Sequence, residues 1–220
     1  MYCERTGPGL WDEPANAVSN VAFLVAAAVL IRLLATGPRR APVSAWLLPV
    51  LLGVVGVCSL SFHTFATTAT AALDTLSILA FILTAVVVLV HGMWRVRWRW
   101  AWTAAPAYLV AALGVNAALF AAGGARATLG GYLPALLGLL GLGAAIRWTA
   151  PGAAPAGRRL LLAGAVFAVS LTLRTLDGPL CGGFPVGTHF LWHILNAVVL
   201  WLVGSAVVRR WQETLTAQAP

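Results

Sequence analysis

Lysine is absent from this 220-residue sequence, acidic residues number only six, and charged residues make up 9% of the chain. Because about 25% of the residues in a typical soluble domain are charged, this scarcity excludes an ordinary soluble protein. Hydrophobic residues make up 60% instead. No polar stretch is long enough to fold alone, and the start of the chain is too polar for a signal peptide. We therefore expect the first apolar segment to insert directly into a membrane.

Long apolar runs fill most of the chain. A bilayer core about 30 Å thick needs roughly 20 apolar residues per helix. Seven runs meet this need, at 15–35, 44–63, 71–91, 101–121, 129–148, 159–177 and 187–208. The predicted fold is all-α, a single seven-transmembrane domain over 1–220. Residues 1–14 would form an extracytoplasmic segment, 15–208 the helix bundle, and 209–220 a cytoplasmic tail.

The arginines are distributed unevenly between alternate loops. One side collects eleven: Arg32, Arg39, Arg40, Arg95, Arg97, Arg99, Arg147, Arg158, Arg159, Arg209 and Arg210. The other side has only Arg5, Arg126 and Arg174. Cytoplasmic loops carry the excess of positive charge, so this pattern predicts an outer amino terminus and a cytoplasmic carboxyl terminus. The composition, rich in Ala, Arg and Gly without lysine, suggests a bacterial protein of the inner (cell) membrane.

The net charge of +8 also raises the question of nucleic-acid binding, since "WRVRWRW" at 94–100 is both basic and aromatic. Tryptophans beside cytoplasmic arginines are typical of a membrane interface. We therefore expect lipid rather than nucleic acid as the partner of this segment.

Four ionisable side chains are expected at one depth, near the outer ends of their spans. His189 and His193, four residues apart, share a helix face. His63 closes the second apolar run, and Asp74 lies in the first turns of the third. Ser59 shares the face of His63. Ionisable groups inside a membrane are costly and mark functional sites, which favours a site over helix packing alone.

Three imidazoles with an open fourth position are the ligand set of a catalytic zinc site. Zinc lowers the pKa of a bound water, a carboxylate can carry the proton, and a hydroxyl can stabilise an oxyanion. Haem is the competing cofactor for membrane histidines. Since His189 and His193 lie on one helix face, they cannot take opposite axial positions, so haem would need His63 and only one of them.

Several motifs together resemble the alkaline ceramidases, within a wider superfamily of seven-span membrane hydrolases that includes the adiponectin-receptor type. The motifs are "CER" at 3–5, "EPANAVSN" at 13–20, "SLSFH" at 59–63 with Asp74 eleven residues later, and "HFLWH" at 189–193. Their order and spacing match from residue 3 to about residue 200. The single motif HxxxH is weak, but the ordered set is specific.

The resemblance implies a zinc-dependent intramembrane amidase that splits ceramide-like lipids into a fatty acid and a sphingoid base. On this basis His63, His189 and His193 would be the zinc ligands. Asp74 would handle the proton of the water, and Ser59 would stand beside the metal.

The resemblance also implies a calcium site and a disulfide. Glu4 and Glu13 match two acidic calcium ligands, and Tyr2 stands where an aromatic residue offers its backbone carbonyl. Met1 and Thr6 depart from the family's Asp and Asn, which weakens the set, because calcium takes six to eight oxygen ligands. Helix capping by acidic residues at 12 and 13 is the alternative. Cys3 and Cys181 match the paired cysteines, and an oxidising outer compartment permits the bond.

Other interpretations of these residues stay open at this stage. The same zinc site would serve a hydrolase of an ester or another lipid bond, and a seven-span receptor or sensor could keep the metal for structure. Cys58 is typical of a small buried hydrophobe. Arg174 and Asp177, three residues apart, are expected to form a local helix ion pair, with contact to the substrate headgroup as the alternative.

Overall fold

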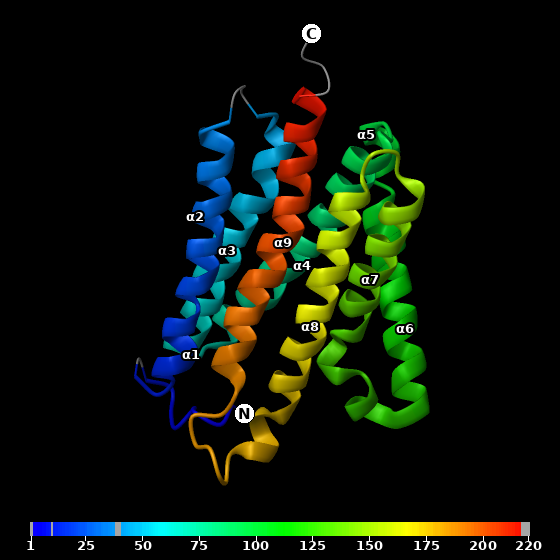
Figure 1. The fold of residues 1–220 in the computed structure, drawn as a ribbon. Helices are drawn as coiled ribbons and strands as arrows, with labels where there is room; N and C mark the ends of the chain where they lie inside the picture. The colour runs from blue at the N-terminus through cyan, green and yellow to red at the C-terminus, as the bar shows by residue number, and fades with distance from the viewer. Residues whose placement is uncertain (1, 10, 38–40, 217–220) are drawn as a thin grey trace.

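The computed structural model describes residues 2–9, 11–37 and 41–216, and in this part of the chain every regular element is helical. Along the chain they are α1 (Pro14–Ser19), α2 (Val21–Ala35), α3 (Val43–Phe65), α4 (Thr68–Trp94), α5 (Trp98–Ala101), α6 (Ala104–Ala127), a 3₁₀ turn (Leu129–Gly131), α7 (Leu133–Thr149), α8 (Ala154–Leu180) and α9 (His189–Thr216). The predicted all-α fold is therefore confirmed. The amino-terminal segment and the end of α9 lie at opposite ends of the bundle (Figure 1).

Six segments are long and apolar enough to cross a membrane. They are Pro14–Ala35, Val43–Phe65, Thr68–Trp94, Trp98–Ala125, Ala154–Leu180 and His189–Thr214. The remaining apolar helix, α7, has 17 residues and spans about 25 Å at 1.5 Å per residue. The chain is therefore a polytopic helical membrane protein. The predicted first span is divided at Asn20, where α1 ends and α2 begins.

Apolar side chains cover much of the outside of the bundle, and polar ones lie within it. Val25, Val54 and Val169 are among the exposed large apolar residues, whereas Asn16 and Asn20 are fully buried. This arrangement suits a protein whose outer surface faces lipid and whose polar groups must be satisfied internally.

Helices α7 and α8 approach each other closely at two glycines. A Cβ at Gly143 would lie 2.9 Å from the backbone nitrogen of Leu161, and one at Gly157 would lie 2.6 Å from that of Arg147. Small residues allow membrane helices to approach closely, so these positions hold the short α7 against α8.

Helix α9 is the most buried span of the bundle and packs against α8, α2, α3 and α4 (Figure 1). Its first residue, His189, lies at the end where α3 turns into α4. Ala66 in the left-handed region ends α3, and Thr67 starts α4 by accepting a hydrogen bond from the backbone N–H of Thr70. This tight turn keeps His63 and the start of α4 at the same end as the start of α9.

Candidate metal centre

Three histidines from two helices meet inside the bundle. One potential ligand atom from each of His63, His189 and His193 lies within 4.8 Å of the others, and all three residues are buried. The ring centroids are 4.6 Å apart for His63 and His193 and for His189 and His193, and 5.3 Å apart for His63 and His189. The predicted convergence of these three residues is confirmed, and together they can hold a metal ion.

The hydrogen bonds of the imidazoles favour metal binding through their other nitrogens. The Nδ1 atom of His63 lies 2.8 Å from Oε2 of Glu13, and the Nδ1 atom of His193 lies 2.8 Å from Oγ of Ser19. Each ring therefore has Nε2 as its remaining ligand atom. The Nδ1 atom of His189 is buried without a hydrogen-bond partner in the described chain. Metal-ligating histidines characteristically use the second nitrogen in this way, so this donor set fits zinc.

Glu13 and Ser19 are the functional residues whose roles the sequence analysis missed. The motif "EPANAVSN" contains both, but the resemblance directed attention to calcium. Glu13, Asn16 and Ser19 are spaced three residues apart, which places them on one side of α1 and its start. Asn16 donates its side-chain N–H to Oε2 of Glu13 at 3.0 Å. From this spacing and the adjacent Asn20, a polar helix face directed at the histidines could have been predicted.

Asp74 and Ser59 line a cavity that the candidate metal ligands also line. The cavity has a volume of about 130 Å³. Ser59 is buried and its side chain interacts with Asp74, whose Oδ1 atom is buried without a hydrogen-bond partner in the described residues. Asp74 does not belong to the cluster of potential ligand atoms found in the same residues. One carboxylate oxygen is therefore left for an incoming group.

The rest of the cavity is mainly apolar. It runs from the histidine end to the opposite half of the bundle, where Leu89, Leu142, Leu160 and Val203 line it. Helices α2, α3, α4, α6, α7, α8 and α9 all contribute lining residues, so the space lies inside the bundle. Its lining, polar at the histidine end and apolar elsewhere, suits a ligand with one polar end and an apolar chain.

The amino-terminal segment closes the polar end of the cavity. The Tyr2 ring stacks on the His189 ring with centroids 3.9 Å apart, and Tyr2 itself lines the cavity. Burial raises the pKa of the Tyr2 hydroxyl to about 12, so the group is a neutral hydrogen-bond donor at physiological pH. Cys3 and Cys181 form the expected disulfide, with Cα atoms 5.3 Å apart, which ties this segment to the loop between α8 and α9.

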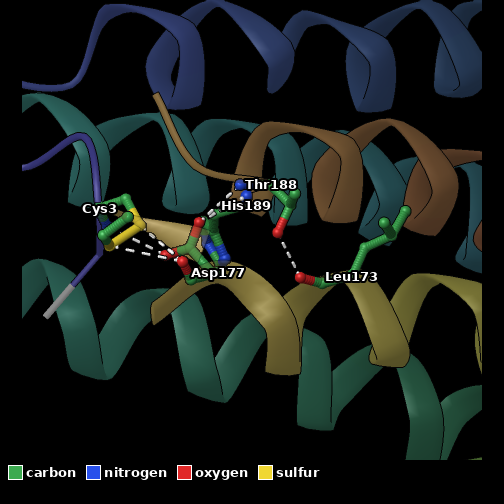
Figure 2. Close-up of a disulfide and its surroundings, with 6 residues drawn as sticks. Cys3, Leu173, Asp177, Thr188 and His189 are labelled. Carbon is green, nitrogen blue, oxygen red and sulfur yellow. Dashed lines mark hydrogen bonds between the residues drawn. A yellow bond between two sulfur atoms is a disulfide. The ribbon is translucent and has the colours of Figure 1, made fainter. Parts of the chain in front are cut away.

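Asp177 anchors both sides of that connection (Figure 2). Its carboxylate accepts hydrogen bonds from the backbone N–H groups of Cys3 at 3.0 Å, Thr188 at 2.8 Å and His189 at 3.0 Å. The expected ion pair between Arg174 and Asp177 is therefore wrong. The start of α9 leaves backbone N–H groups without helical partners, and a buried carboxylate there satisfies them.

The residues that the resemblance assigns to calcium are engaged with hydrogen-bond donors. Both oxygens of Glu4 accept backbone N–H groups at the start of α1, from Ala15 at 2.7 Å and Asn16 at 2.8 Å. Glu13 pairs with Arg5 as well as with His63. The Tyr2 carbonyl accepts the backbone N–H of Arg5. Since calcium requires oxygens that are free to coordinate it, this arrangement does not fit a calcium site, and Arg5 supplies the positive charge instead.

Comparison with known proteins adds no assignment, because no family model and no curated protein matches the chain.

Proposed function

We propose that this protein is a zinc-dependent intramembrane hydrolase that cleaves the amide bond of ceramide or a related N-acyl lipid to a fatty acid and a free amine. The observation that carries the proposal is the buried cluster of His63, His189 and His193 beside a carboxylate with an unengaged oxygen, at the polar end of an apolar cavity. The resemblance of the motifs to the alkaline ceramidases supports the same reaction.

The three histidines would hold zinc, which when bound would activate a water and polarise the amide carbonyl as a Lewis acid. Asp74 would accept the proton of the attacking water at its free Oδ1 and deliver it to the leaving nitrogen. This transfer is required because an amide nitrogen leaves only as a neutral amine. Ser59 would hydrogen-bond either the developing oxyanion or the carboxylate of Asp74, which keeps that carboxylate directed into the cavity.

The apolar part of the cavity would take the acyl chain. Its lining of leucine, valine and phenylalanine side chains offers dispersion contacts and excludes water from most of the chain length. Only the polar end then exposes the substrate to a proton carrier and to water. This division would place the amide at the histidines.

The proposed membrane arrangement counts α7 as a seventh span. Its 17 residues reach the lower end of the range for a transmembrane helix, about 17–25 residues. Seven spans agree with termini at opposite ends of the bundle (Figure 1). With the side richer in arginine in the cytoplasm, the candidate metal centre would lie at the outer leaflet of the inner membrane. Substrate would then enter from that leaflet.

The decisive experiment is an assay of purified protein in neutral detergent against a panel of N-acyl lipids and matched esters with the same acyl chain. We expect amide hydrolysis that a zinc chelator abolishes and added zinc restores. Cleavage of the esters alone would reassign the bond. Zinc binding without turnover on any lipid would contradict the hydrolase and favour a receptor or sensor.

A further inference from the structure

Arg174 is the only arginine that lines the cavity among the described residues. It lies in α8, and its guanidinium carbon is 4.8 Å from the ring centroid of Tyr132 and 5.5 Å from that of Trp192. Trp192 directly precedes His193 on α9. The two aromatic faces therefore hold a positive charge at the histidine end of the cavity by cation–π contacts.

Within the described residues, no ion pair neutralises this charge, since no carboxylate there pairs with Arg174. Asp177, one turn away, is occupied by three backbone N–H groups, and Glu13 is occupied by Arg5 and His63. Asp74 lines the same cavity but lies beyond ion-pair distance. A cation at membrane depth is costly without a partner. An anion that comes from outside the chain could therefore bind to Arg174.

We propose that Arg174 binds an acidic group, a carboxylate or a phosphate, on the amine side of the scissile amide, which makes the substrate an anionic N-acyl lipid such as an N-acyl amino acid. This assignment rests on the proposed hydrolase function. The planar guanidinium fork matches both anions and can bind either through two parallel hydrogen bonds. Since the apolar half of the cavity suits the acyl chain, the charged end of the substrate must lie on the other side of the amide.

The same contact discriminates between headgroups. A neutral headgroup, such as that of ceramide, would leave the guanidinium unpaired at membrane depth, whereas an acidic headgroup would neutralise it. An enzyme of this construction therefore selects acidic N-acyl lipids through binding, while Asp74 and the candidate metal centre act on the amide in either case. The selectivity should appear mainly in KM.

The test compares two amides that share one acyl chain, N-acylglycine and N-acylethanolamine, which differ by a carboxylate in place of a hydroxymethyl group. We expect the wild-type protein to prefer N-acylglycine. Arg174→Gln should raise KM for N-acylglycine by about 10- to 100-fold, the loss typical of a hydrogen bond to a charged group, and change KM for N-acylethanolamine by less than about threefold. Arg174→Lys should restore part of the preference because it keeps the charge.

The matched control is Arg158→Gln, which removes the same charge from an exposed position near the other end of α8. It should leave the kinetics of both substrates unchanged. Equal losses on both amides in Arg174→Gln would show a structural role for the cation–π contacts, and a wild-type preference for N-acylethanolamine would overturn the assignment while leaving the hydrolase function intact.

A binding measurement separates failure of this proposal from failure of the hydrolase function. If no amide is cleaved, the hydrolase is contradicted, and thermal unfolding with N-acylglycine still reports on Arg174. If N-acylglycine raises the melting temperature of the wild-type protein but not that of Arg174→Gln, the anion site is supported. If N-acylglycine does not raise the wild-type melting temperature, the anion site is overturned. Stabilisation by phosphatidylglycerol alone, again dependent on Arg174, would identify a bilayer phospholipid as the source of the anion and overturn the substrate assignment.

Discussion

The Nδ1 atom of His63 lies 2.8 Å from the Oε2 atom of Glu13, although 50 positions separate the two residues in the chain. Both side chains are almost completely buried. Glu13 precedes α1, and His63 lies in the last turn of α3. The segment before the first helix is therefore an integral part of the candidate metal centre, where it orients an imidazole as well as covering the cavity.

Removing this carboxylate should weaken metal binding. We expect Glu13→Gln to lower the zinc affinity by about 10- to 100-fold, because outer partners of a ligating histidine fix its orientation and raise its basicity. Competition with a zinc chelator measures the effect. Glu4→Gln is the control, since Glu4 contacts the start of α1 rather than a histidine. Equal losses of affinity in both variants would assign Glu13 to folding of the segment alone.

The histidines themselves set the metal content. Purified protein should carry about one zinc ion per chain, the stoichiometry of a single three-histidine site. His189→Ala and His193→Ala should each remove most of it, because two imidazoles leave the ion poorly held. His91→Ala should retain the zinc, since His91 lies at the opposite end of α4 from Asp74. Elemental analysis that finds no zinc, or full zinc in both ligand variants, would exclude this site.

Asp74 is expected to serve the chemistry and not the metal. Asp74→Asn should keep the zinc but lose about 10²–10⁴-fold in turnover, the usual contribution of general acid–base catalysis. Ser59→Ala should lower turnover by a smaller factor if the hydroxyl donates one hydrogen bond to the oxyanion. Zinc content and turnover are measured on the same preparations. Joint loss of metal and activity in Asp74→Asn would make Asp74 a ligand or a structural support.

The histidine cluster could be predicted from the sequence, and the spacing of Glu13, Asn16 and Ser19 could have indicated a polar helix face, but the particular hydrogen bonds that this face makes to the histidines could not be predicted. His189 and His193 are four residues apart on one helix, and the alternation of spans brings the end of the second apolar run to the same level. Those relations follow from helix geometry and loop order. The bond between Ser19 and His193 depends instead on how α1 packs on α9, and such tertiary contacts leave no period in the sequence.

Arg174 and Asp177 give the converse case, in which the sequence predicts a contact that the structure does not form. Their spacing favours a local ion pair, but three backbone N–H groups compete for the carboxylate and occupy it. Two of these groups belong to the start of α9 and one to Cys3, which lies 174 positions away. A helix start that is buried must satisfy its N–H groups, and that demand exceeds the gain from a partly exposed pair.

Asp177→Asn should destabilise the fold around the disulfide. The amide oxygen of asparagine can still accept hydrogen bonds from the N–H groups of Thr188 and His189, but its NH₂ group would face the N–H of Cys3. We therefore expect the free energy of unfolding to fall by about 1–3 kcal/mol, because a buried donor is left unsatisfied. Thermal unfolding in detergent, with the disulfide intact, measures it. Asp12→Asn, which changes a carboxylate with exposed hydrogen bonds, should cost less. Equal melting temperatures in wild type and Asp177→Asn would contradict the anchoring role.

The proposed topology predicts where added tags become accessible. A reporter fused after the last residue should be active in the cytoplasm, and a tag before the first residue should be reachable from outside intact cells, because cytoplasmic loops carry most of the arginines. Detection of both termini on the same side would show an even number of spans and would remove α7 from the membrane.

The disulfide between Cys3 and Cys181, separated by 178 positions, has a consequence for biogenesis. The ribosome releases Glu13 and His63 long before it has made Cys181 and His189. The nascent chain therefore holds one of its three candidate metal ligands and one of the two bonded cysteines throughout most of translation, and both sets are completed in the same late interval. An interrupted or incompletely inserted product would lack His189 and His193 as well as the covalent link, so a partial protein could not assemble the candidate metal centre.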